Sequence, residues 1–246
     1  MKTSNKIIIA GALIMMGIIT IGIVSAKSVF KESYTIPTGN RIEKTYDLAK
    51  FSKINLRDNV ECTLKKSDKQ LVKVEIDEAW LDKLKVSVSG DEFLGFDLDG
   101  FGKTGPIKVT IHYTDLSMLT IKNAKCSGEI IADSMTHVTV IAGSELNATL
   151  KTDYSNLLLQ SGAQVILEGK CTSLNTRAES GSDLDASKLL VETCSAAVYS
   201  GARCKLNVIN VLKATAQSGG DISYLGNPEM NGLDVKSGGA VNKLEE

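Results

Sequence analysis

The C-terminal half of the chain repeats one arrangement of apolar and polar positions around a glycine. The glycines recur at nearly even intervals, at Gly143, Gly162, Gly181, Gly201, Gly219 and Gly238. Three residues after each glycine the side chain is apolar: Leu146, Val165, Leu184, Cys204, Ile222 and Val241. Three residues before it the side chain is again apolar: Val140, Leu159, Ala178, Val198, Ala216 and Val235. Two residues after it lies a mostly polar position: Glu145, Gln164, Asp183, Arg203, Asp221 and Ala240. This alternation on both sides of a tight turn predicts pairs of β-strands with one buried face.

The regular spacing of the glycines, about 19 residues, indicates stacked coils, each of which buries its apolar face only against its neighbours. An imperfect earlier copy lies at Leu119–Gly128, where Asn123 takes the turn position and Cys126 falls in the inward column. Asparagine tolerates the left-handed backbone that a glycine adopts freely. The sequence therefore predicts an all-β parallel solenoid of about seven coils over residues 116–246, with like positions stacked ~4.8 Å apart.

Residues 1–26 have the features of a targeting segment. Lys2 and Lys6 precede the uncharged apolar run Ile7–Val24, and Val24-Ser25-Ala26 fits a small-residue cleavage pattern. The run is also just long enough to serve as an uncleaved membrane anchor, which needs about 17–25 residues. In either case we expect an exported chain, located in the periplasm, on the outer envelope surface or in the medium. Residues 27–46 are polar and are predicted to form a tether.

Residues 47–115 are predicted to form a β-rich part that covers the open end of the solenoid, continuous with it in one domain over residues 47–246. Alternating apolar positions in Val60–Leu64 and Val72–Ile76, separated by a short turn, favour a hairpin. The segment Asp77–Leu84 is predicted to form one or two helical turns, capped by Asp77, with Trp80, Leu81 and Leu84 turned inward. Exposed strand edges need such a cover.

Composition narrows the range of partners. With 28 basic and 29 acidic residues the net charge is −1, which indicates neither a nucleic acid nor an anionic membrane surface as partner. Contact with a membrane is expected only through an uncleaved N-terminal segment. Aromatic residues make up 5% of the chain, too few for a large stacking platform for sugars or bases.

The strand at Ile54–Leu56, the segments Val60–Leu64, Val72–Asp77 and Ile107–Ile111, and the serial Ser-Gly-small turns ending near Tyr224–Pro228 together resemble a bacterial family. It is the "putative auto-transporter adhesin, head GIN domain" family, common in Bacteroidetes, and the resemblance extends from about Asp47 to the C-terminus. It implies a secreted or envelope protein with a right-handed parallel β-helix-like fold, and adhesion as its activity. It brings no catalytic motif. Five cysteines and a single turn close to Ser-Gly-Gly-Asp, at Ser218–Asp221, depart from the usual pattern.

One group of charged residues is a candidate ligand-binding patch, because its members fall on the outward phase of neighbouring coils. Its members are Asp183, Asp185, Arg203, Lys205 and Asp221. Such a patch could bind a charged sugar or a cation, but the alternating signs on adjacent coils favour cross-strand charge pairing on a solvated face. No catalytic or cofactor-binding residues are predicted. No metal-binding residues are predicted either, because His112 and His137 are not at the ligand spacing of a zinc site.

The cysteines are expected to be buried free thiols that act as small hydrophobic side chains. Cys126 and Cys204 share the inward column but lie four coils apart, about 19 Å at the strand spacing, too far for a disulfide. Cys171 and Cys194 lie at different phases of the coil, and the fifth residue is Cys62.

The sequence thus favours a non-enzymatic, adhesin-like binding module for a glycan, or for an envelope or host protein. Two alternatives remain open. One is a carbohydrate-active β-helix enzyme, a polysaccharide lyase or hydrolase that uses clustered carboxylates. The other is an envelope scaffold protein of the periplasm.

Overall fold

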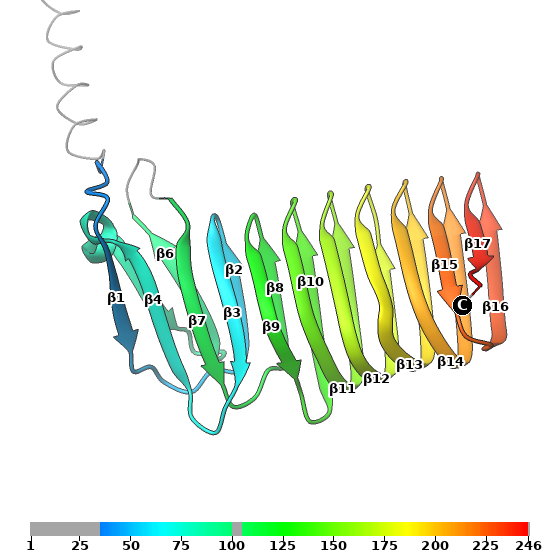
Figure 1. Ribbon diagram of the computed structural model, residues 1–246, viewed down its shortest axis with the longest axis horizontal. Coiled ribbons are helices and arrows are strands. Elements are labelled where there is room, and N and C mark those ends of the chain that lie inside the picture. The colour runs from blue at the N-terminus through cyan, green and yellow to red at the C-terminus, as the bar shows by residue number, and fades with distance from the viewer. Residues whose placement is uncertain (1–34, 100–104, 246) are drawn as a thin grey trace, which may run out of the picture.

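The computed structural model describes residues 35–99 and 105–245, and this part of the chain forms a continuous β-solenoid (Figure 1). Its strands are β1 (Arg41–Tyr46), β2 (Lys53–Arg57), β3 (Val60–Lys66), β4 (Leu71–Asp77), β5 (Leu84–Val88), β6 (Phe93–Leu98), β7 (Ile107–Tyr113), β8 (Met118–Lys122), β9 (Lys125–Ile131), β10 (Met135–Ile141), β11 (Glu145–Gln160), β12 (Gln164–Ala178), β13 (Asp183–Tyr199), β14 (Arg203–Gln217), β15 (Asp221–Leu225), β16 (Glu229–Lys236) and β17 (Ala240–Lys243). A 3-10 helix, η1 (Glu78–Lys83), follows β4. The predicted all-β parallel solenoid is confirmed, and its repeat is visible in the pairing of Leu146 with Val165 and of Val165 with Leu184.

The strands form two faces that enclose the core. Sheet A runs in the order β1, β4, β7, β3, β9, then the first halves of β11 to β14, then β15 and β17. Sheet B runs β5, β6, β2, β8, β10, then the second halves of β11 to β14, then β16. The four long strands bend at one corner of the coil and contribute to both sheets, and tight turns close the other corner (Figure 1).

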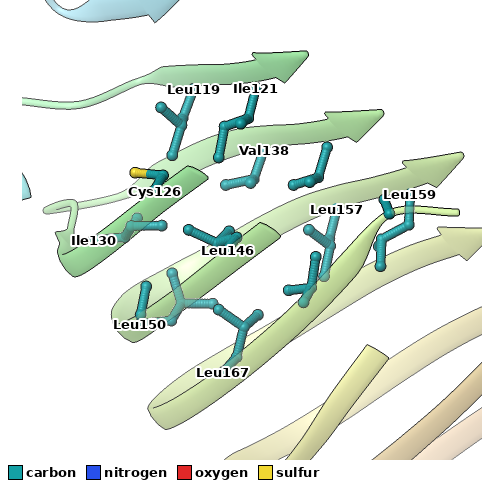
Figure 2. Packing of buried hydrophobic residues seen from close by; sticks show 14 of the residues in the cluster. Leu119, Ile121, Cys126, Ile130, Val138, Leu146, Leu150, Leu157, Leu159 and Leu167 are labelled. Atoms are coloured by element: carbon teal, nitrogen blue, oxygen red, sulfur yellow. The ribbon is translucent and has the colours of Figure 1, made fainter. Parts of the chain in front are cut away.

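The predicted inward columns are buried through the body of the solenoid. Five members of each column are at most 2% exposed, from Leu146 to Ile222 on sheet A and from Val140 to Ala216 on sheet B. Figure 2 shows these side chains stacked between the two sheets, with Leu119, Val138 and Leu157 following one another along sheet B. The last coil differs, since Val235 is 43% exposed. Its inward column continues, but no coil follows it among the described residues.

The tight turns use two consecutive left-handed residues, where the sequence predicted one. Ser161 has φ 56° and Gly162 has φ 73°, and the equivalent pairs in the other coils share this pattern. Consecutive residues with positive φ are typical of type I′ turns, and the Ala202 N–H donates a hydrogen bond to the Tyr199 carbonyl across one of these turns at 3.1 Å. The residue after the glycine is small because it packs inside, as at Ala163 and Ala202, both fully buried. Asn123, predicted to take the turn position of the earliest copy, has φ 49°.

The predicted hairpin between Val60–Leu64 and Val72–Ile76 is wrong. Strand β7 lies between β3 and β4, parallel to β3 and antiparallel to β4. Strands β2 and β3 form a coil of their own, inserted between the β6/β7 coil and the β8/β9 coil. Figure 1 shows this segment between elements that come later in the chain. The N-terminal part therefore adds two coils to the seven predicted within the described residues, and the spatial order of coils departs from the chain order.

The N-terminal end of the solenoid is covered. Sheet A ends with the antiparallel strands β4 and β1, and sheet B ends with antiparallel β5. Between them η1 begins at Asp77, whose carboxylate accepts a hydrogen bond from the Ala79 N–H, and places Trp80 in the core at 1% exposure. The predicted capped helical turn is thus present as a 3-10 helix, with Leu84 buried and Leu81 half-buried.

The predicted tether over residues 27–46 is wrong at its C-terminal end. Residues 41–46 form strand β1 and pair with β4. The targeting segment predicted at residues 1–26 lies outside the described residues, as do residues 100–104. Among the described helices, none has the length and apolar character needed to cross a membrane.

Candidate ligand-binding face

The outward side of sheet A carries a row of charged side chains that crosses almost the whole molecule. Strand register places its members on successive strands as Glu75, Lys108, Glu61, Lys125, Glu145, Gln164, Asp183, Arg203 and Asp221. A second row runs beside it, two residues before the first row on antiparallel β4 and two residues after it on the other strands. Its members are Lys73, Thr110, Thr63, Ser127, Asn147, Ile166, Asp185, Lys205 and Ser223. Both rows begin at the N-terminal cap and extend to the last coils.

The cap end of these two rows is hollowed into a groove of about 450 Å³. We call it the cap groove. Its outward-facing lining comprises Glu43, Glu61, Thr63, Lys73, Glu75, Lys108, Thr110, Lys125, Ser127, Glu145 and Asn147. These residues come from β1, β4, β7, β3, β9 and β11, six neighbouring strands of sheet A. The groove therefore spans the antiparallel cap strands β1 and β4 and the parallel strands beside them.

The charges in the cap groove are largely paired with one another. Three lysine–glutamate pairs cross neighbouring strands: Lys73–Glu43 at 3.3 Å, Lys108–Glu75 at 3.7 Å and Lys125–Glu145 at 2.9 Å. Arg41 adds a second cation to Glu75, with 2.5 Å between its Nε and the carboxylate Oε1. The hydrogen bond from Arg41 lowers the pKa of Glu75, and nearby Lys108 lowers it further. Exposed pairs of this kind contribute little to stability, about 0–1 kcal/mol each.

Beside the paired charges lies a row of uncharged hydrogen-bonding groups. Thr110, Thr63, Ser127 and Asn147 occupy register-matched outward positions on β7, β3, β9 and β11. They present hydroxyl and amide groups at the spacing of neighbouring strands, ~4.8 Å. Hydroxyls both donate and accept, and amides offer both functions, so this row suits a ligand rich in hydroxyl or amide groups.

The predicted patch lies on the same face, further along the solenoid. The structure places Asp183, Arg203 and Asp221 in register on β13, β14 and β15, and sets Asp185 beside Lys205 two residues further along the strands. The Arg203 guanidinium binds the Asp183 carboxylate in a bidentate pair. Its Nε donates to Oδ1 at 2.7 Å and its Nη2 donates to Oδ2 at 3.0 Å. The hydrogen bonds to Asp183 raise the pKa of Arg203 above the ordinary arginine value.

The remaining members of the patch also interact within the chain. Asp185 accepts hydrogen bonds from the Ser187 hydroxyl at 2.6 Å and from the Ser187 N–H at 3.1 Å. The Ser187 hydrogen bond lowers the pKa of the Asp185 carboxyl despite the opposing effect of burial. Asp221 keeps one buried carboxylate oxygen, Oδ1, without a hydrogen-bond partner. The patch is thus a run of cross-strand charge contacts on a flat sheet, whereas the hollow lies at the cap.

The five cysteines are free and buried, as predicted. Cys126 lies in the inward column, opposite Cys62 on the neighbouring strand. Burial raises the pKa of Cys171 to about 11 and that of Cys194 to about 12, so these thiols stay protonated at neutral pH. A protonated thiol is a poor nucleophile and a poor metal ligand.

The described residues hold no cluster of three or more His, Cys, Asp or Glu side chains placed to bind a metal ion. His112 and His137, on β7 and β10, are both half-buried and lie on opposite sheets. The outward side chains of the cap groove can form hydrogen bonds along the uncharged row and can exchange their surface ion pairs for those of a ligand.

Sequence reasoning predicted that Asp183, Arg203 and Asp221 lie on neighbouring strands, but it missed the cap groove. Asp183 and Arg203 occupy the same phase of a regular repeat, so their proximity could be deduced from the period. The groove depends on Lys108 lying between Glu61 and Glu75, which requires β7 between β3 and β4. The alternation of apolar and polar residues in each of these three strands was visible, but the sequence carried no local signal of their order.

Solved structures share the fold at low sequence identity. A "putative adhesin" of Bacteroides fragilis superposes with a TM-score of 0.76 at 17% identity, covering 84% of this chain and 98% of that chain. A "putative lipid binding protein" of Parabacteroides distasonis gives 0.70 at 15% identity, covering 86% and 100%. A "putative adhesin" of Parabacteroides merdae gives 0.62 at 16%, covering 87% and 100%. The comparison with curated proteins gave no match.

The family model matches the region that builds both sheets. It covers residues 50–228, from the start of the β2/β3 coil to the turn before the last coil, which confirms the resemblance noted in the strand and turn motifs. The chain belongs to the family described as "Putative auto-transporter adhesin, head GIN domain".

Proposed function

We propose that the chain is an exported, non-enzymatic binding module of the adhesin type, which takes a glycan or a protein segment on the outward face of sheet A. The observation that carries the proposal is the cap groove, a hollow of about 450 Å³ lined by paired charges and an uncharged hydrogen-bonding row. Membership of an adhesin family supports it.

The chemistry of the groove favours an uncharged, hydroxyl-rich ligand. Each lysine of the groove is already paired with a glutamate, so an anionic ligand must break existing pairs. The row of Thr110, Thr63, Ser127 and Asn147 needs no such exchange. An extended glycan that crosses the strands would meet one hydrogen-bonding side chain per strand, ~4.8 Å apart. The charged lining offers no apolar slot for an acyl chain, so it does not favour the lipid binding named for the Parabacteroides distasonis protein.

The test is ligand binding to a matched pair of variants. Asn147 lies in the cap groove on sheet A, and Asn175 is an exposed, outward-facing asparagine on sheet B. Asn147→Lys puts a long charged side chain across the groove and removes the contact that the asparagine amide would make with the ligand. We expect it to weaken binding to neutral glycans at least about tenfold. Asn175→Lys adds the same charge elsewhere and should leave binding unchanged. Equal losses in both variants, or no saturable binding to any glycan or surface protein, would overturn the proposal.

Export is tested separately by protease treatment of intact cells. We expect the chain to be digested from outside if it acts as an adhesin. Protection until the outer envelope is broken would favour the alternative of a periplasmic scaffold. Release of reducing ends or unsaturated sugars from acidic polysaccharides, abolished in Asp183→Ala, would favour the enzyme.

A further inference from the structure

The C-terminal end of the solenoid is an exposed cross-section of its core. Three side chains of β16 stand in the inward columns but remain exposed: Met230 at 38%, Leu233 at 60% and Val235 at 43%. Their register partners one coil earlier, Leu212, Ala214 and Ala216, are at most 1% exposed. Val241, across the core on β17, is only half-buried. The difference arises because no coil follows β16 and β17 among the described residues.

Within the described residues, the backbone of β16 also has its outer edge free to hydrogen-bond with a further strand. In the body of the solenoid, the Leu159 carbonyl accepts a hydrogen bond from Glu179 of the next coil at 3.0 Å. Strand register carries the Leu159 position through Ala178, Val198 and Ala216 to Val235. The carbonyl of Val235 therefore points away from the solenoid, at a free edge. Free edges flanked by apolar side chains are templates for pairing with another chain.

We propose that this end face, formed by β16 and β17, docks against the same face of a second copy of this chain, giving a closed two-fold dimer. A head-to-tail stack has no matching surface, because the N-terminal end is covered by β1, β4, β5 and η1. Two identical faces can pair isologously about a two-fold axis, which also prevents growth into a fibre. The exposed part of the core is then buried as it is in every other coil.

The charges beside Val235 complement themselves under this symmetry. When β16 pairs antiparallel with β16 of the second copy about Val235, Asp234 lies opposite Lys236 of that copy, and the reverse pair forms as well. Within one chain these two residues already attract each other, with 2.9 Å between the Lys236 Nζ and the Asp234 Oδ1. Opposite charges on facing strands stabilise the pairing, whereas like charges oppose it.

The dimer would have a functional consequence. A two-fold axis that passes through both sheets keeps sheet A of the two copies on one side. Two cap grooves would then face the same way at opposite ends of one long particle. A surface with repeated ligands can engage both, which raises the effective affinity without any new contact.

Sedimentation velocity of the full chain over a range of concentrations tests the proposal. We expect a dimer for the wild type, and a dissociation constant raised at least about tenfold by Leu233→Asp, as for a central interface residue. Ile166→Asp is the matched control, because Ile166 is 50% exposed on the outer face of β12 and should not affect the dimer. A wild-type monomer at every concentration, or equal behaviour of both variants, would overturn the proposal. So would a wild-type chain held in a complex with a different protein through this face.

A charge exchange keeps the test decisive if Leu233→Asp fails to fold. Asp234→Lys places a lysine opposite Lys236 of the second copy and should raise the dissociation constant. The double variant Asp234→Lys/Lys236→Asp restores opposite signs and should recover the dimer. A double variant no better than the single one would contradict the antiparallel register about Val235.

Discussion

At the scale of single residues, the contact between successive coils sets the size of the residue that follows each turn glycine. Gly220 illustrates the limit, because a Cβ added there would lie 2.2 Å from the Val198 carbonyl oxygen. We predict that Gly220→Ala lowers the free energy of unfolding by about 1–3 kcal/mol, the usual cost of overpacking. Gly90→Ala is the control, since its added Cβ would meet no atom within 4 Å. Thermal unfolding of the two variants checks the prediction. Equal melting midpoints would show that the neighbouring coil accommodates the added Cβ at no cost in stability.

The two phases of each strand give a second prediction at this scale. Leu184 is 2% exposed in the inward column, whereas neighbouring Asp183 points outward and pairs with Arg203. Leu184→Asp should cost more than about 3 kcal/mol, because it removes buried apolar contact and buries an unpaired charge. Asp183→Ala removes one exposed ion pair and should cost no more than about 1 kcal/mol. Chemical denaturation measures both, and similar midpoints would mean that the strand is inverted.

At the scale of elements, one carboxylate joins two segments of the cap. Asp77, at the end of β4, accepts hydrogen bonds from the Gly39 N–H at 2.7 Å, the Ala79 N–H at 3.0 Å and the Thr38 N–H at 3.1 Å. Burial works to raise the pKa of Asp77, but the hydrogen bonds from Thr38, Ala79 and Gly39 outweigh it and lower the pKa below the ordinary aspartate value. The carboxylate thereby joins the segment before β1 to the start of η1.

This arrangement predicts acid sensitivity of the cap. A group whose pKa is lowered by folding stabilises the protein fully above its unfolded pKa, about 3.9 for aspartate, and loses that contribution as the pH falls through the lower folded pKa. Asp77→Asn should therefore lower the melting temperature at neutral pH, and its difference from the wild type should shrink below about pH 4. Melting curves across pH measure this. A difference that stays constant far into the acid range would assign the loss to packing instead of to the charge.

The elements also show where sequence reasoning succeeds and where it fails. A repeat makes each coil a copy of the previous one. The alternation within each strand and the stacking of the coils therefore both place Leu146, Val165 and Leu184 in the core, as the sequence predicted. The strands Val60–Lys66 and Leu71–Asp77 gave the local signal of a hairpin, yet β7 separates them. Their order is decided by packing between segments far apart in the chain, which a repeat does not encode. The cap groove depends on that order, and so it could not be predicted.

At the scale of the whole molecule, the solenoid has two unlike ends. At the C-terminal end the chain adds coils in sequence order, and the last coil contacts only the coil before it. At the N-terminal end the β2/β3 coil lies in the interior, between the β6/β7 coil and the β8/β9 coil. Repeat proteins with nearest-neighbour contacts usually tolerate loss of terminal coils. Here that tolerance should hold at one end only.

Two truncations test this asymmetry. A chain ending at Asn227 lacks β16 and β17, which removes one terminal coil and leaves every other strand pairing in place. We expect it to melt cooperatively at a lower temperature than the full chain. A chain starting at Ser67 lacks β1, β2 and β3, so β6 and β7 lose their parallel partners and the β8/β9 coil loses its neighbour. This deletion removes a whole coil from inside the N-terminal part of the core, where Ile54, Leu56 and Leu64 are at most 1% exposed, and it should abolish cooperative melting. Circular dichroism and hydrogen exchange distinguish the two outcomes. If the chain starting at Ser67 kept protected amides in β6 and β7, the N-terminal coils would be separable from the solenoid, and the cap groove would not depend on the insertion of β2 and β3.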